Sequence, residues 1–314
     1  AAMSSPLVFF TGPHGSSDHR AVRLFGSLDQ PDAHPMASLW EVLETVDHTP
    51  DALGIVPIES SIDGELMSVV DRILFSTSNL LFAGEAVLSE SIAVFAHRSD
   101  ATPRRVVSHP EVLQICHSYI AMNALQSEIA DATSVACERV RDARDPSLVA
   151  LAPHEVGSAY GLVAVADDPA AIPEIRTRYL LAARHVAAPT GFDRTMLAIS
   201  PPADAPGVLA HLLESFSGNG VNLSSLTSRP LRTDDAHAHY AFVITADGHI
   251  TDENVRTAVR AVLSNGSRVR LLGSFARWLG PEVVTPFGEV PLGSVDADDA
   301  AVLLDPPQAA GART

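Results

Sequence analysis

The alternation of short apolar runs with helical patterns, and its change near residue 190, constrains the fold of this chain most. Residues 7–11 and 52–57 are typical of strands, while 19–25, 38–46 and 67–74 have helical apolar spacing. Residues 80–184 continue in this style, with strands predicted over 88–95, 105–108, 149–153 and 176–183. Helices are predicted over 111–123, 131–139 and 155–161. This order predicts an α/β unit over residues 6–187 with two lobes and a ligand cleft between them, at the carboxyl ends of strands.

From residue 193 the apolar spacing follows a different order. It predicts strands over 195–200, 221–228, 240–246 and 269–272, and helices over 208–216 and 252–263. The order βαββαβ over residues 193–279 is that of the ferredoxin-like motif. Residues 280–314 are rich in Pro, Gly and Asp and contain one basic residue, Arg313, which predicts a mostly disordered acidic tail.

The charged residues restrict the chemistry, because all 21 basic residues are Arg and the chain contains no Lys. Schiff-base catalysis through lysine and a phosphate-binding P-loop are therefore excluded. The net charge of −17 argues against nucleic acid and anionic membranes as partners. A small anion remains possible, held by Arg, His or backbone N–H groups.

Other composition features predict a cytoplasmic protein with no membrane span and no metal site. No apolar run reaches the ~18 residues that span a bilayer, and no signal peptide is visible. Cys116 and Cys137 lack metal-ligand spacing and are expected to be small buried hydrophobes. Among the 13 histidines only His237 and His239 are closely spaced, in a polar segment that does not favour a metal site.

The run Arg176-Thr177-Arg178-Tyr179 is the strongest candidate for a binding site. Two guanidinium groups flank one hydroxyl at the start of a predicted strand, an arrangement suited to holding a carboxylate beside a proton donor. A surface Arg pair on an edge strand would have the same pattern.

Hydroxyl-rich segments follow three other predicted strands or loops. They are Ser16 and Ser17 after a two-glycine turn, Glu59-Ser60-Ser61 after a strand, and Thr133-Ser134 at a helix start. Each segment could direct hydroxyl and N–H groups at an anion, or could serve only as a helix cap. His109, between Ser108 and Pro110, is either an acid or base or a structural histidine.

The order of these segments resembles the prephenate dehydratase family over about residues 6–276. The matching motifs are Gly12-Pro13-x-Gly15-Ser16, Pro57-Ile58-Glu59-Ser60-Ser61-x-x-Gly64, Ser108-His109-Pro110, Thr133-Ser134, Thr177-Arg178-Tyr179, Asp193-Arg194-Thr195 and Asn222-Leu223-Ser224-x-x-Thr227-Ser228-Arg229-Pro230. The resemblance implies a two-lobed, periplasmic-binding-protein-like catalytic domain followed by an ACT regulatory domain.

The resemblance also implies a reaction, in which prephenate loses CO2 and water to give phenylpyruvate without a cofactor. It assigns Thr177 to the departure of the hydroxyl group and Arg178 to a substrate carboxylate. The remaining substrate-binding residues that it implies are Ser16, Ser17, Glu59, Ser60, Ser61, Thr133, Ser134 and Tyr179.

Several residues depart from the family pattern. Gly-Thr-Phe-Ser is replaced by Gly15-Ser16-Ser17-Asp18, Pro-Ile-Glu-Asn-Ser by Pro57-Ile58-Glu59-Ser60-Ser61, and Thr-Arg-Phe by Thr177-Arg178-Tyr179, while Ile175 replaces an Asn. Two alternatives follow: a prephenate decarboxylase that keeps the C4 hydroxyl, and a non-catalytic amino-acid sensor on the same scaffold.

In the family's ACT domain, phenylalanine binds between two segments at a subunit interface. The residues implied here are Gly207, Val208, Leu209, Asn222, Leu223, Thr227, Ser228, Arg229 and Pro230. Thr227 stands where the family has Glu, so weakened or altered control by phenylalanine is expected. Pairing of two such domains implies a homodimer or homotetramer, and a purely dimerising role for the domain is the alternative.

Overall fold

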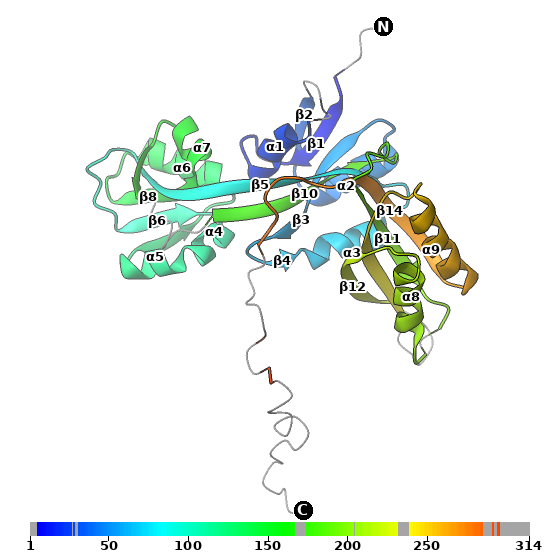
Figure 1. Ribbon diagram of the computed structural model, residues 1–314. Coiled ribbons are helices and arrows are strands. Elements are labelled where there is room, and N and C mark those ends of the chain that lie inside the picture. The colour runs from blue at the N-terminus through cyan, green and yellow to red at the C-terminus, as the bar shows by residue number, and fades with distance from the viewer. Residues whose placement is uncertain are drawn as a thin grey trace, which may run out of the picture.

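The computed structural model describes residues 5–26, 28, 31–166, 174–203, 205–231, 239–284, 291, 294 and 295. Two lobes share two long strands, and a third unit packs beside the first lobe (Figure 1). Asp204, His237 and most of the predicted acidic tail lie outside the described residues.

The first lobe is built on parallel strands β2 (Asp32–Met36), β1 (Leu7–Thr11) and β3 (Leu53–Ser60). The short strand β4 (Gly64–Glu65) pairs with the end of β3. Helices α2 (Leu39–His48) and α3 (Met67–Ser76) contribute apolar side chains to one core cluster. Helix α1 (Ser17–Ala21) and a 3-10 turn (Val22–Leu24) contribute to another.

Strands β5 (Leu81–Ala96) and β10 (Glu174–Ala183) connect the lobes. Along residues 81–91, β5 pairs antiparallel with β10, and β10 pairs antiparallel with β3. From Ile92 onward β5 pairs with strands of the second lobe instead. A strand of 16 residues, many of them buried, thus belongs to both lobes and passes behind the cleft.

The second lobe has the strand order β7 (Gln126–Ile129), β6 (Arg105–Ser108), β8 (Leu148–Pro153), then β5 and β9 (Val163–Ala166). Its helices are α4 (Pro110–Ile115), α5 (His117–Met122), α6 (Thr133–Ala143) and α7 (His154–Ala159). Cys116 lies between α4 and α5 and Cys137 within α6, and both thiols are free and buried, as expected.

The third unit follows the predicted order βαββαβ. Its elements are β11 (Asp193–Ser200), α8 (Val208–Ser217), β12 (Leu223–Leu231), β13 (His239–Asp247), α9 (Glu253–Ser264) and β14 (Arg268–Ala276). The sheet order β12-β13-β11-β14, antiparallel throughout, is ferredoxin-like.

The third unit and the first lobe share one apolar core. Leu272 and Phe275 of β14 belong to the same buried cluster as Phe82 of β5 and Leu80, which directly precedes that strand. The two sheets touch where Gly273 pairs with Phe82. A Cβ atom on Gly273 would lie 2.5 Å from the Phe82 carbonyl oxygen, so only glycine permits this approach.

The structure corrects several predicted elements. The helix predicted over 111–123 is broken at Cys116 into α4 and α5. Helix α1 begins at Ser17 and is capped by Ser16, whose Oγ accepts a hydrogen bond from the His19 N–H group. Strands β2, β7 and β9 were not predicted, because they are short and largely lack alternating apolar and polar residues. No helix in the described ranges is long and apolar enough to cross a membrane.

Candidate active site

A cavity of about 400 Å³ lies between the two lobes. The first lobe contributes the β1–α1 turn and the end of β3, and the second lobe contributes the starts of α4 and α6. Residues of β5 and β10 complete the lining. The polar residues among those that line it are Thr11, Ser16, Ser17, Asp18, Ser60, Asp63, Glu90, His109, Glu111, Asp131, Thr133, Thr177 and Tyr179.

Strand β10 presents alternate residues to the cavity. Ile175, Thr177 and Tyr179 line it, and their register against β5 is regular over this stretch. Because successive side chains of a strand point to opposite faces, Arg176 and Arg178 lie on the other face of the sheet. Thr177 is therefore placed at the ligand cavity, and Arg178 is not.

Arg178 and Glu59 are predicted to contact the substrate, and this placement gives that prediction no support. Neither residue lines the cavity, and Arg178 Nη2 lies 3.2 Å from Glu59 Oε2 on the opposite face. The Arg178 Nε atom is buried without a hydrogen-bond partner in the described part of the chain. Spacing alone could not separate the two arginines from Thr177, since adjacent residues on a strand face opposite sides.

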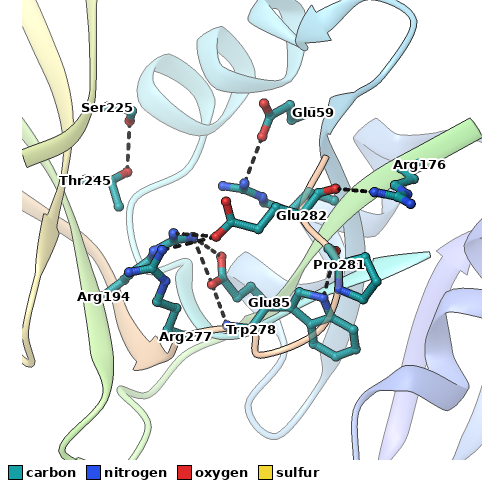
Figure 2. A network of polar contacts seen from close by, with 11 residues as sticks. Glu59, Glu85, Arg176, Arg194, Ser225, Thr245, Arg277, Trp278, Pro281 and Glu282 are labelled. Atoms are coloured by element: carbon teal, nitrogen blue, oxygen red, sulfur yellow. Dashed lines mark hydrogen bonds and ion pairs between the residues drawn. The ribbon is translucent and has the colours of Figure 1, made fainter. Parts of the chain in front are cut away.

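An ion-pair network occupies this opposite face (Figure 2). Arg194 and Arg277 donate to the Glu282 carboxylate at 3.4 and 3.1 Å, and Arg176 donates to the Glu282 carbonyl oxygen at 3.1 Å. The hydrogen bond from Arg277 lowers the pKa of Glu282, with further contributions from the charges of Arg194 and Arg178. Arg176, expected to be an exposed charge, is therefore bound to the segment that follows the third unit.

The serines of the first lobe are partly used by the fold. Ser16 donates to the Thr11 carbonyl oxygen at 3.1 Å, and Ser17 donates to Glu90 Oε1 at 3.1 Å. Ser60 Oγ accepts backbone N–H groups of residues 62 and 63. Ser61 does not line the cavity, and its Oγ accepts the Arg176 N–H group at 3.0 Å. Ser16 both caps α1 and lines the cavity, while Ser17 and Ser60 line the cavity and also make hydrogen bonds within the fold.

The second lobe presents the start of α6 to the cavity. Ala132 occupies the N-cap position and provides no side-chain hydrogen bond, while Ala132 and Thr133 both line the cavity. Ser134 is 2% exposed, does not line the cavity, and its Oγ has no partner among the described residues. The uncapped N–H groups of an 11-residue helix favour an anion at this position.

Sequence reasoning missed several residues that line the cavity, among them Thr11 and Glu90. Thr11, the last residue of β1, lines the cavity with a buried Oγ1 beside Asp18. Glu90 of β5 also lines it and is paired with Arg20. Burial raises the pKa of Glu90, and the charge of Arg20 opposes this rise. For Thr11, the sequence feature that could have indicated a place at the cavity was its position at the carboxyl end of a strand. No sequence feature indicated Glu90.

The cavity is electrostatically unusual for an anion site. Five carboxyl groups line it and, among the residues described, no arginine does. Burial raises the pKa of Asp18 to about 6, with a smaller contribution in the same direction from Glu90. His109 lies at the cavity 3.8 Å from Glu111, measured between Nδ1 and Oε2. No group of three or more potential metal-ligating side chains occurs in the part of the chain described.

The predicted effector segments of the third unit line two different cavities. Gly207, Val208 and Leu209 line one of about 230 Å³. Arg229 and Pro230 line a larger one of about 970 Å³, next to α3 of the first lobe. The single chain therefore does not bring the two segments to one site.

The remaining effector candidates contribute to the fold. Asn222 donates to Asp247 at 2.9 Å, and Leu223 packs against the core of the third unit. Ser228 is exposed on β12. Thr227 donates to Glu65 Oε2 at 2.6 Å, and Arg229 Nε donates to Asp71 Oδ1 at 2.6 Å. Strand β12 is thereby tied to the first lobe.

The fold and the cavity define a two-lobed α/β protein with a polar-lined cavity between its lobes and a ferredoxin-like unit after them. A sequence model of the prephenate dehydratase family matches residues 8–187, which is more than half of the 314 residues. The chain therefore belongs to the prephenate dehydratase family, in agreement with the resemblance of its motifs.

Similar proteins extend this relationship beyond the two lobes. The prephenate dehydratase of Amycolatopsis methanolica is 28% identical over 277 residues, covering 87% of this chain and 89% of the relative. The structure of the enzyme from Staphylococcus aureus superposes with a TM-score of 0.72 at 26% identity, covering 86% of this chain and 99% of that one. A prephenate dehydratase from Arthrobacter aurescens, solved in complex with L-Phe, also gives 0.72 at 26% identity, covering 89% and 93%.

Proposed function

We propose that this chain is a prephenate dehydratase that converts prephenate to phenylpyruvate, CO2 and water in phenylalanine biosynthesis. The observation that carries the proposal is the position of Thr177. It lines the interlobe cavity on β10, inside the region that matches the family. Residues 6–187 then form the catalytic domain and residues 193–279 the ACT regulatory domain. No cofactor is required, since aromatisation of the ring drives the elimination.

Prephenate carries two carboxylates, and the cavity offers N–H and hydroxyl groups to hold them. The uncapped start of α6 with Thr133 suits one carboxylate, and Thr11 with the β1–α1 turn suits the opposite end of the ligand. The Thr177 hydroxyl donates a hydrogen bond to the C4 oxygen as negative charge develops on it. Arg178 acts from the other face of the sheet, where it supports the conformation of β10.

The test is the product formed from prephenate by the purified chain, measured by absorbance and mass spectrometry. Phenylpyruvate supports the proposal. A non-aromatic keto acid that keeps the hydroxyl would instead identify a decarboxylase, and absence of turnover would identify a sensor.

Variants of Thr177 test the assigned role. Thr177→Val keeps the side-chain volume but lacks the donor, so kcat should fall on the order of 100-fold to 1000-fold. Thr177→Ser should retain most of the activity. Thr257→Val, on exposed helix α9 where the hydroxyl bonds only to Glu253, is the matched control and should retain full activity.

Regulation is proposed from the third unit and from the relative solved with L-Phe. Leu209 and Leu213 of α8, with Leu226 and Tyr240, are apolar side chains of this unit that are 37–39% exposed. We expect two copies to pair through this unit as a homodimer or within a homotetramer, and phenylalanine to act more weakly because Thr227 replaces Glu. Light scattering and inhibition curves with and without phenylalanine test both points. A biosynthetic role also supports a cytoplasmic location, where Cys116 and Cys137 remain free thiols.

A further inference from the structure

Two departures from the family pattern contact each other inside the cavity. Asp18 stands where the family has Ser, and Tyr179 stands where it has Phe. The Tyr179 hydroxyl donates a hydrogen bond to Asp18 Oδ1 at 3.1 Å, and both residues line the cavity. A carboxyl group and a phenol have thus been introduced together beside Thr177.

We propose that Asp18 is the acid that protonates the departing C4 hydroxyl, and that Tyr179 is a positioning residue that holds its carboxyl group. This proposal rests on the dehydratase activity proposed above. It assigns to this chain a catalytic residue that the family pattern does not contain.

The geometry places the acid and the threonine on adjacent walls. Thr177 and Tyr179 are alternate residues of β10, roughly 7 Å apart along the strand, and both face the cavity. Asp18 lies in the first turn of α1 and reaches this strand through the Tyr179 hydroxyl. An oxygen atom that accepts from Thr177 therefore shares one cavity with the carboxyl group of Asp18.

The chemistry balances with one proton from Asp18. The bond between C1 and its carboxylate breaks and releases CO2, and its electron pair enters the ring. The C4–O bond breaks, and the leaving oxygen takes the Asp18 proton to depart as water. Asp18 becomes a carboxylate, to which the Tyr179 hydroxyl donates, and a proton from solvent restores the acid. A threonine hydroxyl alone is too weak an acid to supply this proton.

The surroundings of Asp18 favour its protonated form. Burial is the main cause of its raised pKa of about 6, and Glu90 on β5 adds to it, while Tyr179 on β10 and Thr11 on β1 oppose it. Arg20 on α1 is paired with Glu90 and Glu155.

The charged groups farther along the cavity lining are Asp63, His109, Glu111 and Asp131. Three of these four are carboxyl groups. Two carboxylates of bound prephenate would raise the pKa of Asp18 further, since nearby negative charge favours the neutral acid.

The experiment is the pH dependence of kcat and kcat/KM with prephenate, between about pH 5 and 9, for the wild type and four variants. A blank without enzyme is subtracted at each pH, because prephenate aromatises spontaneously in acid. Asp18→Asn keeps the shape without the acid, Asp18→Ser restores the family residue, and Tyr179→Phe removes only the hydrogen bond. Asp63→Asn removes a charge of the same cavity without removing the acid. Thermal unfolding checks that each variant is folded.

The expected wild-type kcat/KM falls as pH rises above about 6, because the acid must be protonated, and kcat falls at a higher pH. In Asp18→Asn and Asp18→Ser, kcat/KM should be at least 10-fold lower than in the wild type at pH 6, and it should no longer decline as pH rises. Tyr179→Phe should move the decline to higher pH, because the hydroxyl lowers the pKa of Asp18. Asp63→Asn should keep the decline.

Two results overturn the proposal and are distinguishable. Turnover by the wild type with an unchanged pH profile in Asp18→Asn refutes the acid role alone. Absence of phenylpyruvate from the wild type at every pH refutes the dehydratase function and the acid role with it.

Discussion

The buried ion pair between Arg194 and Glu85 joins the ferredoxin-like unit to the first lobe. Arg194 Nη1 lies 3.1 Å from Glu85 Oε1, and the side chains are 6% and 2% exposed. The same carboxylate oxygen accepts the Trp278 N–H group at 2.7 Å (Figure 2). We predict that Glu85→Gln destabilises the protein strongly, because it leaves the Arg194 guanidinium buried beside a neutral amide.

The expected loss follows from burial. Breaking a buried ion pair by removing one charge costs about 3–5 kcal/mol, since the remaining ion lacks both water and its partner. Glu282, with a side chain 53% exposed and 3.4 Å from Arg194, offsets only part of this cost. In a protein of this size, such a loss lowers the midpoint of thermal unfolding by roughly 10 °C.

The assay is urea unfolding followed by circular dichroism, with Glu85→Gln, Arg194→Met and the double variant forming a cycle. The free energy of unfolding lost in the double variant should be smaller than the sum of the two single-variant losses by at least about 2 kcal/mol. Glu174→Gln is the matched control, because the side chains of Glu174 and its partner Arg176 are 42% and 26% exposed. This pair should contribute less than about 1 kcal/mol to the free energy of unfolding. A loss below about 1 kcal/mol in Glu85→Gln, equal to that of this control, would refute the reasoning.

Three further predictions concern stability. Asp18→Asn should be more stable than the wild type by up to about 3 kcal/mol above pH 6, and equally stable below pH 4. The reason is that folding raises the pKa of Asp18 from 3.8 to about 6, so the stability of the wild type falls as pH rises across this interval. Denaturant titrations at pH 4 and 7.5 measure this, and an equal difference at both pH values would contradict it. Gly273→Ala should lose about 1–3 kcal/mol, because its Cβ would lie 2.5 Å from a carbonyl oxygen of β5, whereas Gly26→Ala, with nothing within 4 Å, should be nearly neutral. Asp47→Ala should lower the free energy of unfolding by about 3 kcal/mol or more, since the buried carboxylate accepts three N–H groups of residues 78–80. Asp47→Asn should lower it less, because one acceptor oxygen remains. Equal losses in these two variants would show that the hydrogen bonds are unimportant.

The sequence predicted the fold class where apolar periodicity is strong. Strands β1 and β6 have the predicted bounds, and the order of elements in the third unit is as expected. The length of β5 was missed, because Glu85 interrupts the apolar pattern before the predicted start at Leu88. Glu85 and Glu90 are buried there by ion pairs with Arg194 and Arg20, which sequence periodicity cannot reveal.

The candidate site was predicted in part. Ser16, Ser17, Ser60, Thr133, Thr177 and Tyr179 converge on one cavity from segments up to 163 residues apart, as the motif order suggested. Arg178 was expected there, and it lies on the opposite face together with Arg176. Asp18 was noticed only as a departure from the family pattern, and its hydrogen bond to Tyr179 appeared only in the folded chain.

The sequence by itself determined the family, the two-part organisation and the residue types available for chemistry, because these follow from local spacing and motif order. Only the tertiary structure decided which of those residues share the cavity. The alternation of a strand sends neighbours to opposite faces, so Thr177 meets the ligand cavity and Arg178 meets Glu59. Contacts across 161 residues of chain, such as that of Asp18 with Tyr179, arise only once the sheet has formed, and the burial that comes with them raises the pKa of Asp18.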